Sequence, residues 1–249
     1  IGLENAINDL KKNLNVDTLE ITESFACSSA AGGLKMSVHG LIYDMTVKAA
    51  KEAALGAGAN IHLITAGILS KYDLEKIKSL HLNIIMIAGG VDYGESKTAL
   101  TNASVIANLK LNIPIIYAGN IVNHDEVKEI FTKAGQDQYL YITENVYPRI
   151  DELNVEPARK IIQDVFEKHI TEAPGMHNVR ATISEHITPT PGSVLIASKL
   201  LQSHLGNLVT IDVGGATTDI HTISEDSNEI SRILISPEPF AKRTVEGDR

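Results

Sequence analysis

Hydrophobic and polar positions alternate along this chain with two different periods. In the first stretch, GLENAINDLKKNL, the residues Leu3, Ile7, Leu10 and Leu14 recur at helical spacing between charged and amide side chains, which predicts an amphipathic helix. From about Leu34 onwards, apolar β-rich runs alternate with runs of helical period, and the joining loops carry glycine or a helix-capping residue. This alternation predicts an α/β protein.

The central part of the chain carries five strand candidates and four helix candidates. The strands are LKMSVHGLI, NIHLITAGI, LNIIMIAGGV, IPIIYAGN and QYLYITENV, and the helices are TVKAAKEAALGAG, KYDLEKIKSL, SKTALTNASVIANL and NHDEVKEIFTKAG. Three of the five strands are nearly continuous hydrophobic runs, which is typical of a mostly parallel sheet covered by helices on both faces. We therefore expect a Rossmann-like or flavodoxin-like layered domain. Gly58 and Gly135 end two of the helices, where a left-handed cap favours a residue without a β-carbon.

The alternation of short strands and helices ends after Pro148. A long helix, VEPARKIIQDVFEKHI, is followed by a region rich in glycine and proline and then by a second helix, SVLIASKLLQSHL. Pro191 is expected as the first residue of that helix, because a missing N–H costs nothing there. We place a domain boundary near residue 150.

Composition narrows the classes of function. The 249 residues include 22 Lys and Arg against 31 Asp and Glu, which gives a net charge of −9, and no basic face with interleaved aromatics indicates a nucleic-acid partner. No apolar run reaches the length of a membrane span, and the first residues do not resemble a signal peptide. The single cysteine, Cys27, excludes an intramolecular disulfide, so we expect a cytoplasmic protein with no membrane partner. A start at Ile1 and an end just after KRTVEGD indicate a piece of a longer chain.

The segment LVTIDVGGATTDIHTI, residues 208–223, carries the strongest chemical signal. It predicts two β-branched-rich strands joined by a tight turn that uses the backbone freedom of Gly214 and Gly215. A plain hairpin is one interpretation. The turn, however, also carries more carboxylates and hydroxyls than a turn requires, namely Asp212, Thr217, Thr218 and Asp219. Exposed N–H groups and Thr hydroxyls can hold phosphate, and a nearby carboxylate can hold hydrated Mg²⁺.

The stretch DVGGATTD resembles the second phosphate loop, D-x-G-x-x-T-x-D, of the superfamily of acetate kinase, sugar kinases and actin. The resemblance implies ATP and Mg²⁺ as cofactors. By position it assigns Asp212 to the metal and Asp219 to the last motif position. It assigns the phosphates to the glycines and threonines of the turn: Gly214, Gly215, Thr217 and Thr218.

Similarity to one family extends over nearly the whole chain. The segments FACSSAAGGLKM, AALGAGA, IAGGVDYG, YAGN, LNVEPAR, TPTPGSVL and PEPFAKRTVEGD resemble segments of the MutL family in the same order. That family accompanies adenosylcobalamin-dependent glutamate mutase and resembles reactivating chaperones of B12-dependent dehydratases. The resemblance implies three parts: a helical segment of the ATPase part at 1–24, an inserted Rossmann-like domain at 25–150, and part of a ribonuclease H-like (actin-like ATPase) domain at 151–249. The superfamily's first phosphate loop and its later adenosine-binding segment are not in this sequence.

Two other glycine-rich stretches are candidates for binding. In CSSAAGG, the residues Ser28, Ser29, Gly32 and Gly33 precede a strand instead of following one, so we favour a structural turn over a phosphate site. A strand followed by a helix flanks IAGGVDYGES, and the carboxyl end of a parallel strand is where open α/β sheets gather ligands. An ordinary loop is an equally good interpretation. This possible second ligand crevice would be lined by Gly89, Gly90, Asp92, Gly94, Gly119 and Asn120.

The remaining candidates are interpreted as structural. The nine histidines show no metal-ligand spacing, and His221 is expected to be a structural or surface residue. Cys27 is expected to be a buried or inert thiol. The leading functional hypothesis is an ATP-dependent chaperone or reactivating factor that works by domain closure. The alternatives are a small-molecule kinase of the same superfamily and an interaction module that does not hydrolyse ATP.

Overall fold

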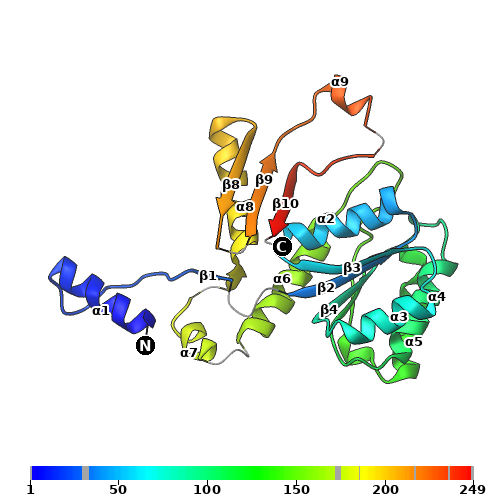
Figure 1. Cartoon of the computed structure of the whole chain (residues 1–249), viewed down its shortest axis with the longest axis horizontal. Helices are drawn as coiled ribbons and strands as arrows, with labels where there is room; N and C mark the ends of the chain where they lie inside the picture. Colours follow the sequence, from blue (N-terminus) through cyan, green and yellow to red (C-terminus); the bar gives the residue numbers. More distant parts are fainter. Residues whose placement is uncertain are drawn as a thin grey trace.

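A computed structural model describes residues 2–29, 34–171, 175–184, 186–215, 217–234 and 236–247. The protein is α/β, as predicted, and Figure 1 shows the arrangement of its elements. Its main sheet has five strands, all parallel, in the order β3-β2-β4-β5-β6. The strands are β2 (Lys35–Gly40), β3 (Asn60–Ala66), β4 (Ile84–Ile87), β5 (Ile115–Tyr117) and β6 (Leu140–Ile142).

The order of these five strands is the flavodoxin-like 2-1-3-4-5 arrangement, counted along the chain. Helices cover both faces of the sheet, which explains why its strands are continuous hydrophobic runs. The helices on one face are α3 (Lys71–Ser79), α4 (Lys97–Asn108) and α5 (His124–Ala134). The opposite face carries α2 (Lys48–Gly56) and α6 (Glu156–Thr171). The predicted layered domain is confirmed.

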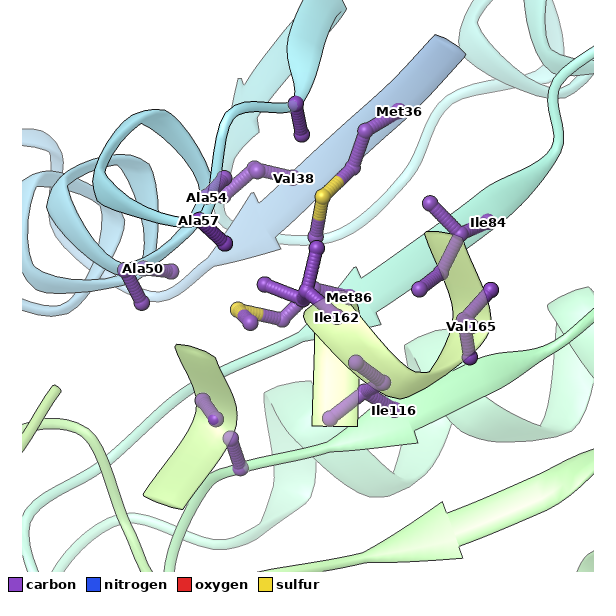
Figure 2. Packing of buried hydrophobic residues seen from close by; sticks show 14 of the residues in the cluster. Met36, Val38, Ala50, Ala54, Ala57, Ile84, Met86, Ile116, Ile162 and Val165 are labelled. Atoms are coloured by element: carbon purple, nitrogen blue, oxygen red, sulfur yellow. The ribbon is translucent and has the colours of Figure 1, made fainter. Parts of the chain in front are cut away.

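Alternating strand residues supply the two cores. Ile84 and Met86 of β4 point into the core under α2 and α6, and Ile85 and Ile87 point into the other. Figure 2 shows the first core, in which small side chains of α2, such as Ala54, lie close to the strands. The division into domains at residue 150 stays a prediction. Side chains of α6, which follows that position, pack in the same core as the parallel strands.

A three-stranded antiparallel sheet, in the order β10-β9-β8, forms the second unit. Its strands are β8 (Leu208–Val213), β9 (Thr217–Ile223) and β10 (Ala241–Gly247). The helix α8 (Thr190–Leu205) packs on one face, where Leu195 contacts a small core. A two-stranded parallel sheet pairs β1 (Ala26–Ser28) with β7 (Ile187–Pro189), and two short helices, α7 (Met176–Arg180) and α9 (Asn228–Ser231), complete this part.

Several element boundaries differ slightly from the prediction. The helix α8 begins at Thr190, so Pro191 is its second residue and not its first. Both positions lie in the first helical turn, where a missing N–H is tolerated. The helix expected from Thr46 begins at Lys48, because a π-helical turn occupies Tyr43–Val47.

The two predicted glycine caps are confirmed. Gly135 caps α5 with φ of 68° and Gly58 follows α2 with φ of 88°. At the end of α2, the N–H groups of Gly58 and Ala59 donate to the carbonyls of Leu55 and Ala54, which is the Schellman arrangement.

The first helix, α1 (Gly2–Leu14), forms as predicted and contains no buried residue. Figure 1 shows it apart from the sheets, joined to β1 by an extended segment. Among the helices of the described residues, none combines the length and the apolar character needed to cross a membrane.

Candidate functional site

The predicted hairpin is present as β8 and β9. Its first strand ends at Val213 and its second begins at Thr217, where the N–H of Gly214 donates to the carbonyl of Thr217 over 2.9 Å. Across the strands, Asp212 lies directly opposite Asp219. Two carboxylates at facing positions repel each other unless cations balance them. Among the described residues, a cation balances Asp219 but not Asp212.

The negative charge of Asp219 is balanced by a buried arginine. Its Oδ1 accepts hydrogen bonds from Nε of Arg243 at 2.7 Å and pairs with Nη2 at 2.7 Å. Both side chains are almost fully buried, with exposed fractions of 7% and 2%. Arg243 also donates through Nη1 to the carbonyls of Leu55 and Ala59, over 3.1 and 3.4 Å. A buried ion pair with its remaining donors satisfied therefore fastens the hairpin sheet to the C-terminal end of α2.

Asp212 has no such partner. Its half-buried carboxylate forms no hydrogen bond or ion pair with a residue that the structure describes. Its charge still reaches the interior, because it acts electrostatically on His221. Asp212 is thus a carboxylate without a partner among the described residues, and its predicted role at a metal stays a prediction.

The hairpin opens into a cavity of about 450 Å³. The turn contributes one wall, and the other walls come from the start of α8, the end of α2 and the residues after β1. The helix α8 directs its N-terminal end, at Pro189, Thr190 and Pro191, toward this cavity. The positive end of the helix dipole favours an anion there, and of these three residues Thr190 alone carries a backbone N–H. The lining residues from the hairpin are Asp212, Gly214, Gly215, Thr217 and Asp219.

The structure thus brings together all but one of the six hairpin candidates. Thr218 is not among the lining residues, because neighbouring residues of a strand point to opposite faces and Thr217 takes the cavity side. Gly214, Gly215 and Thr217 are exposed. The N–H of Gly214 is already used within the hairpin, which leaves the N–H of Gly215 and the hydroxyl of Thr217 accessible to a ligand. Asp219 reaches the cavity only as the partner of Arg243.

His221 lies behind this site and not at the surface. It is fully buried in β9 between Thr210 and Arg243 on the flanking strands. Burial lowers the pKa of His221, and the neighbouring Arg243 lowers it further. Neither ring nitrogen has a hydrogen-bond partner among the described residues. A neutral, structural role fits these surroundings.

The possible second crevice is occupied by the chain's own polar groups. The side-chain amide of Asn120 donates to the carbonyl of Gly94 over 3.2 Å, and its oxygen accepts from the N–H of Tyr93 over 3.0 Å. Asp92 accepts hydrogen bonds from the N–H of Ile121 and from Asn145, each over 3.0 Å.

The glycines of this region meet backbone closely. A β-carbon on Gly119 would lie 3.0 Å from backbone atoms of Gly89, and one on Gly90 would lie 2.0 Å from the carbonyl oxygen of Glu95. Close packing of loops explains the glycines here, and ligand binding at this position stays a prediction.

The N-terminal serines and the cysteine have surroundings that the sequence did not indicate. Ser28 and Ser29 line the cavity beside the hairpin, since β1 pairs with β7 just before α8. Gly32 and Gly33 lie outside the described residues. The expectation of burial for Cys27 was wrong: the thiol is exposed, because β1 belongs to a sheet of only two strands.

Sequence reasoning missed Arg243, the start of α8 and Ser28 as parts of one site. These residues come close to the hairpin through tertiary packing, which the residue types around each of them in the sequence do not reveal. One signal was available, however. Four of the segments that carried the family resemblance supply cavity residues: FACSSAAGGLKM, AALGAGA, TPTPGSVL and PEPFAKRTVEGD.

The fold and the site define an α/β protein in which a parallel layered unit adjoins a glycine hairpin, and the Asp212 carboxylate of this hairpin has no partner in the part of the chain that the structure describes. A family model described as MutL protein matches residues 1–249. The Protein MutL of Clostridium tetanomorphum is 42% identical over 256 residues, covering 100% of this chain and 55% of the relative. The chain therefore belongs to the MutL family. It spans about half the length of the curated relative it matches.

Proposed function

We propose that this chain is part of an ATP-binding accessory protein that uses Mg²⁺-ATP to act on an adenosylcobalamin-dependent mutase, with glutamate mutase as the expected partner. The single observation that carries the nucleotide part is the cavity at the hairpin. It joins the exposed turn at Gly215, a carboxylate that has no partner among the described residues, and a helix N-terminus. The ATPase class and the mutase partner rest on the resemblance to the MutL family and to actin-like ATPases.

The residues present fit a metal–phosphate group. The carboxylate of Asp212 would hold Mg²⁺ through water, and the N–H of Gly215 with the hydroxyl of Thr217 would hold phosphate oxygens. Gly214 would contribute by closing the turn, since its N–H already donates to the carbonyl of Thr217. The N-terminal end of α8 would add favourable electrostatics. Bound Mg²⁺ would neutralise phosphate charge that otherwise meets the two aspartates. Asp219 would contribute indirectly, since Arg243 already pairs with it.

A chaperone-type role is favoured over a small-molecule kinase. The hairpin is tied to α2 by Arg243, so an event at the turn is connected to the parallel layered unit. A kinase would also need a carboxylate base beside the transferred phosphate. The only other carboxylate on the cavity wall among the described residues is Asp219, which is paired with Arg243. We place the protein's action in the cytoplasm, as its single cysteine suggests.

The test is to replace Asp212 and Thr217 separately with alanine and to titrate Mg²⁺-ATP calorimetrically. Each change removes one polar ligand group from an exposed or half-exposed position, so we expect binding about tenfold weaker or more, without loss of folding. Thr222→Ala is the matched control, because Thr222 lies in β9 outside the cavity. Unchanged affinity in both Asp212→Ala and Thr217→Ala would remove the proposed site.

A further inference from the structure

Most backbone groups on the outer edge of β10 have no hydrogen-bond partner among the described residues. The N–H of Ser224 donates to the carbonyl of Phe240, and this bond fixes which β10 residues pair with β9. In an antiparallel ladder the paired residues alternate, so Lys242, Thr244 and Glu246 face β9 while Arg243, Val245 and Gly247 turn their backbone groups outward.

A second hydrogen bond agrees with this division of β10 into residues that face β9 and residues that face outward. The carbonyl of Ala241, which belongs to the outward set, accepts a hydrogen bond from Nη2 of Arg159 over 3.1 Å. Beyond Ala241, the outward N–H and C=O groups of Arg243, Val245 and Gly247 have no partner among the described residues. β10 is the edge strand of its sheet. An edge with free groups at every second residue is a template for another strand.

This edge runs along a groove of about 710 Å³. The helix α2 contributes lining residues, and so does β3, which is the edge strand of the parallel sheet. Figure 1 shows β10 ending beside α2 and β3. From Lys242 to Gly247 the strand is roughly 17 Å long at about 3.4 Å per residue. That length matches an extended peptide of about five residues.

The charges in the groove favour an acidic occupant. Lys48, Lys51, Lys242 and Arg243 line it, against Asp44 and Glu52. Lys51 forms no hydrogen bond or ion pair with the described residues. Glu52 is 3% exposed and its Oε2 has no partner among them. Burial raises the pKa of Glu52. An acidic side chain in the groove would meet Lys51, a cation without a hydrogen-bond or ion-pair partner among the described residues.

We infer that this groove binds an extended, acidic segment of a partner protein, which adds to β10 as a further strand. Backbone pairing with Val245 and its neighbours would supply affinity, and Lys51 would select for acidic side chains. This surface is distinct from the proposed nucleotide site, although Asn60, Thr217 and Arg243 line both cavities. Its test therefore does not depend on ATP.

The decisive variant is Val245→Pro. The N–H of Val245 points outward, so proline removes a donor to the added strand and leaves the ladder with β9 intact. Val245→Thr is the control, because it keeps the N–H and suits a strand. The probe is the fluorescein-labelled peptide Thr-Val-Glu-Val-Glu-Thr with blocked ends, measured by fluorescence polarisation. A second probe carries lysine in place of each glutamate.

We expect the acidic peptide to bind the wild type and Val245→Thr with the same affinity. It should bind Val245→Pro about tenfold more weakly, and the lysine peptide should bind the wild type about tenfold more weakly than the acidic peptide does. Lys51→Glu should narrow or reverse the preference between the two peptides. Circular dichroism checks that each variant is folded.

Three results would overturn the inference. They are no binding of the acidic peptide by the wild type, equal binding by a folded Val245→Pro, and no preference for the acidic peptide. Sedimentation that shows a dimer of this chain, lost in Val245→Pro, would assign the edge to a second copy instead and would likewise contradict it.

Discussion

At the scale of single residues, Gly90 is the position where the fold most clearly requires glycine. Its φ is 67°, and an added β-carbon would lie 2.0 Å from the carbonyl oxygen of Glu95. Gly90→Ala is therefore expected to cost roughly 2–4 kcal/mol, from left-handed strain together with the clash. Urea unfolding measures this loss of stability. Gly67→Ala is the control, since Gly67 has φ of 82° and open space around it, and a loss no larger than that of Gly67→Ala would refute the explanation.

A second residue-scale prediction concerns acid stability. His39 is fully buried between Ser37 and Thr65, to which its ring nitrogens are bonded over 2.9 and 2.8 Å. Burial lowers the pKa of His39 from 6.5 to about 4. The unfolded chain therefore binds a proton between about pH 6.5 and pH 4 that the folded chain does not. Stability from this group is complete above pH 6.5 and declines as the pH falls toward 4.

We expect His39 to account for about 2 kcal/mol of the stability lost between pH 7 and pH 5. Urea unfolding of the wild type and of His39→Gln at both pH values measures this share. His39→Gln will be less stable at pH 7 but should lose less on acidification. Equal losses in the two proteins would show that His39 is not the titrating group.

Local chemistry predicted part of the candidate site. The crowding of Asp212 and Thr217 around two glycines is visible in the sequence, and the structure places both on one cavity wall. The pairing of Asp219 with Arg243 was not predictable, because 24 positions separate the two residues. Burial of His221 was also hidden, since it depends on which face of β9 the helix α8 covers.

At the scale of elements, α3 offers a test of helix capping. The hydroxyl of Ser70 accepts from the N–H of Asp73 over 3.2 Å, and the Asp73 carboxylate accepts from the N–H of Ser70 over 2.8 Å. The Ser70 hydroxyl also donates to the Asp73 carboxylate over 2.6 Å, and this bond, followed by the one from the Ser70 N–H, lowers the pKa of Asp73. Ser70→Ala should cost about 1 kcal/mol in chemical unfolding. Ser79→Ala, at the other end of the helix, should cost clearly less, and equal costs would argue against the capping box.

Element types were predictable where periodicity was strong. The five parallel strands and the helices between them follow from continuous apolar runs and helical spacing. The first and last residues of the helices and strands were harder to predict from the sequence. The π-helical turn before α2 depends on Thr46, whose hydroxyl accepts from the N–H groups of Leu41 and Ile42 over 2.9 and 3.2 Å. Such a contact competes with a regular helix start and leaves no periodic signal.

At the scale of the whole molecule, the pair of Asp219 and Arg243 fastens the antiparallel sheet to α2. Asp219→Ala would leave the guanidinium buried without its counter-ion, which is expected to cost about 3–5 kcal/mol. Glu129→Ala is the control, because Glu129 pairs with Lys133 at the surface, and we expect no measurable change from it. Chemical unfolding measures both. A stable Asp219→Ala would mean that the two units are held together by other contacts.

The arrangement of the units was only partly predictable. Alternation of strands and helices indicated a layered domain, but not that β2 would lie between β3 and β4. Nor does the sequence show that α6 covers the parallel sheet, although it follows the predicted boundary. Strand order and helix placement depend on long-range packing, which residue patterns do not record.

The most direct test of the central claim is hydrogen–deuterium exchange of residues 208–223 with and without Mg²⁺-ATP. A nucleotide held by the turn should slow exchange at the amide of Gly215, whose N–H has no hydrogen-bond partner among the described residues. The effect should require Mg²⁺ and should be lost in Asp212→Ala. Unchanged exchange in this hairpin at saturating Mg²⁺-ATP would contradict the nucleotide site.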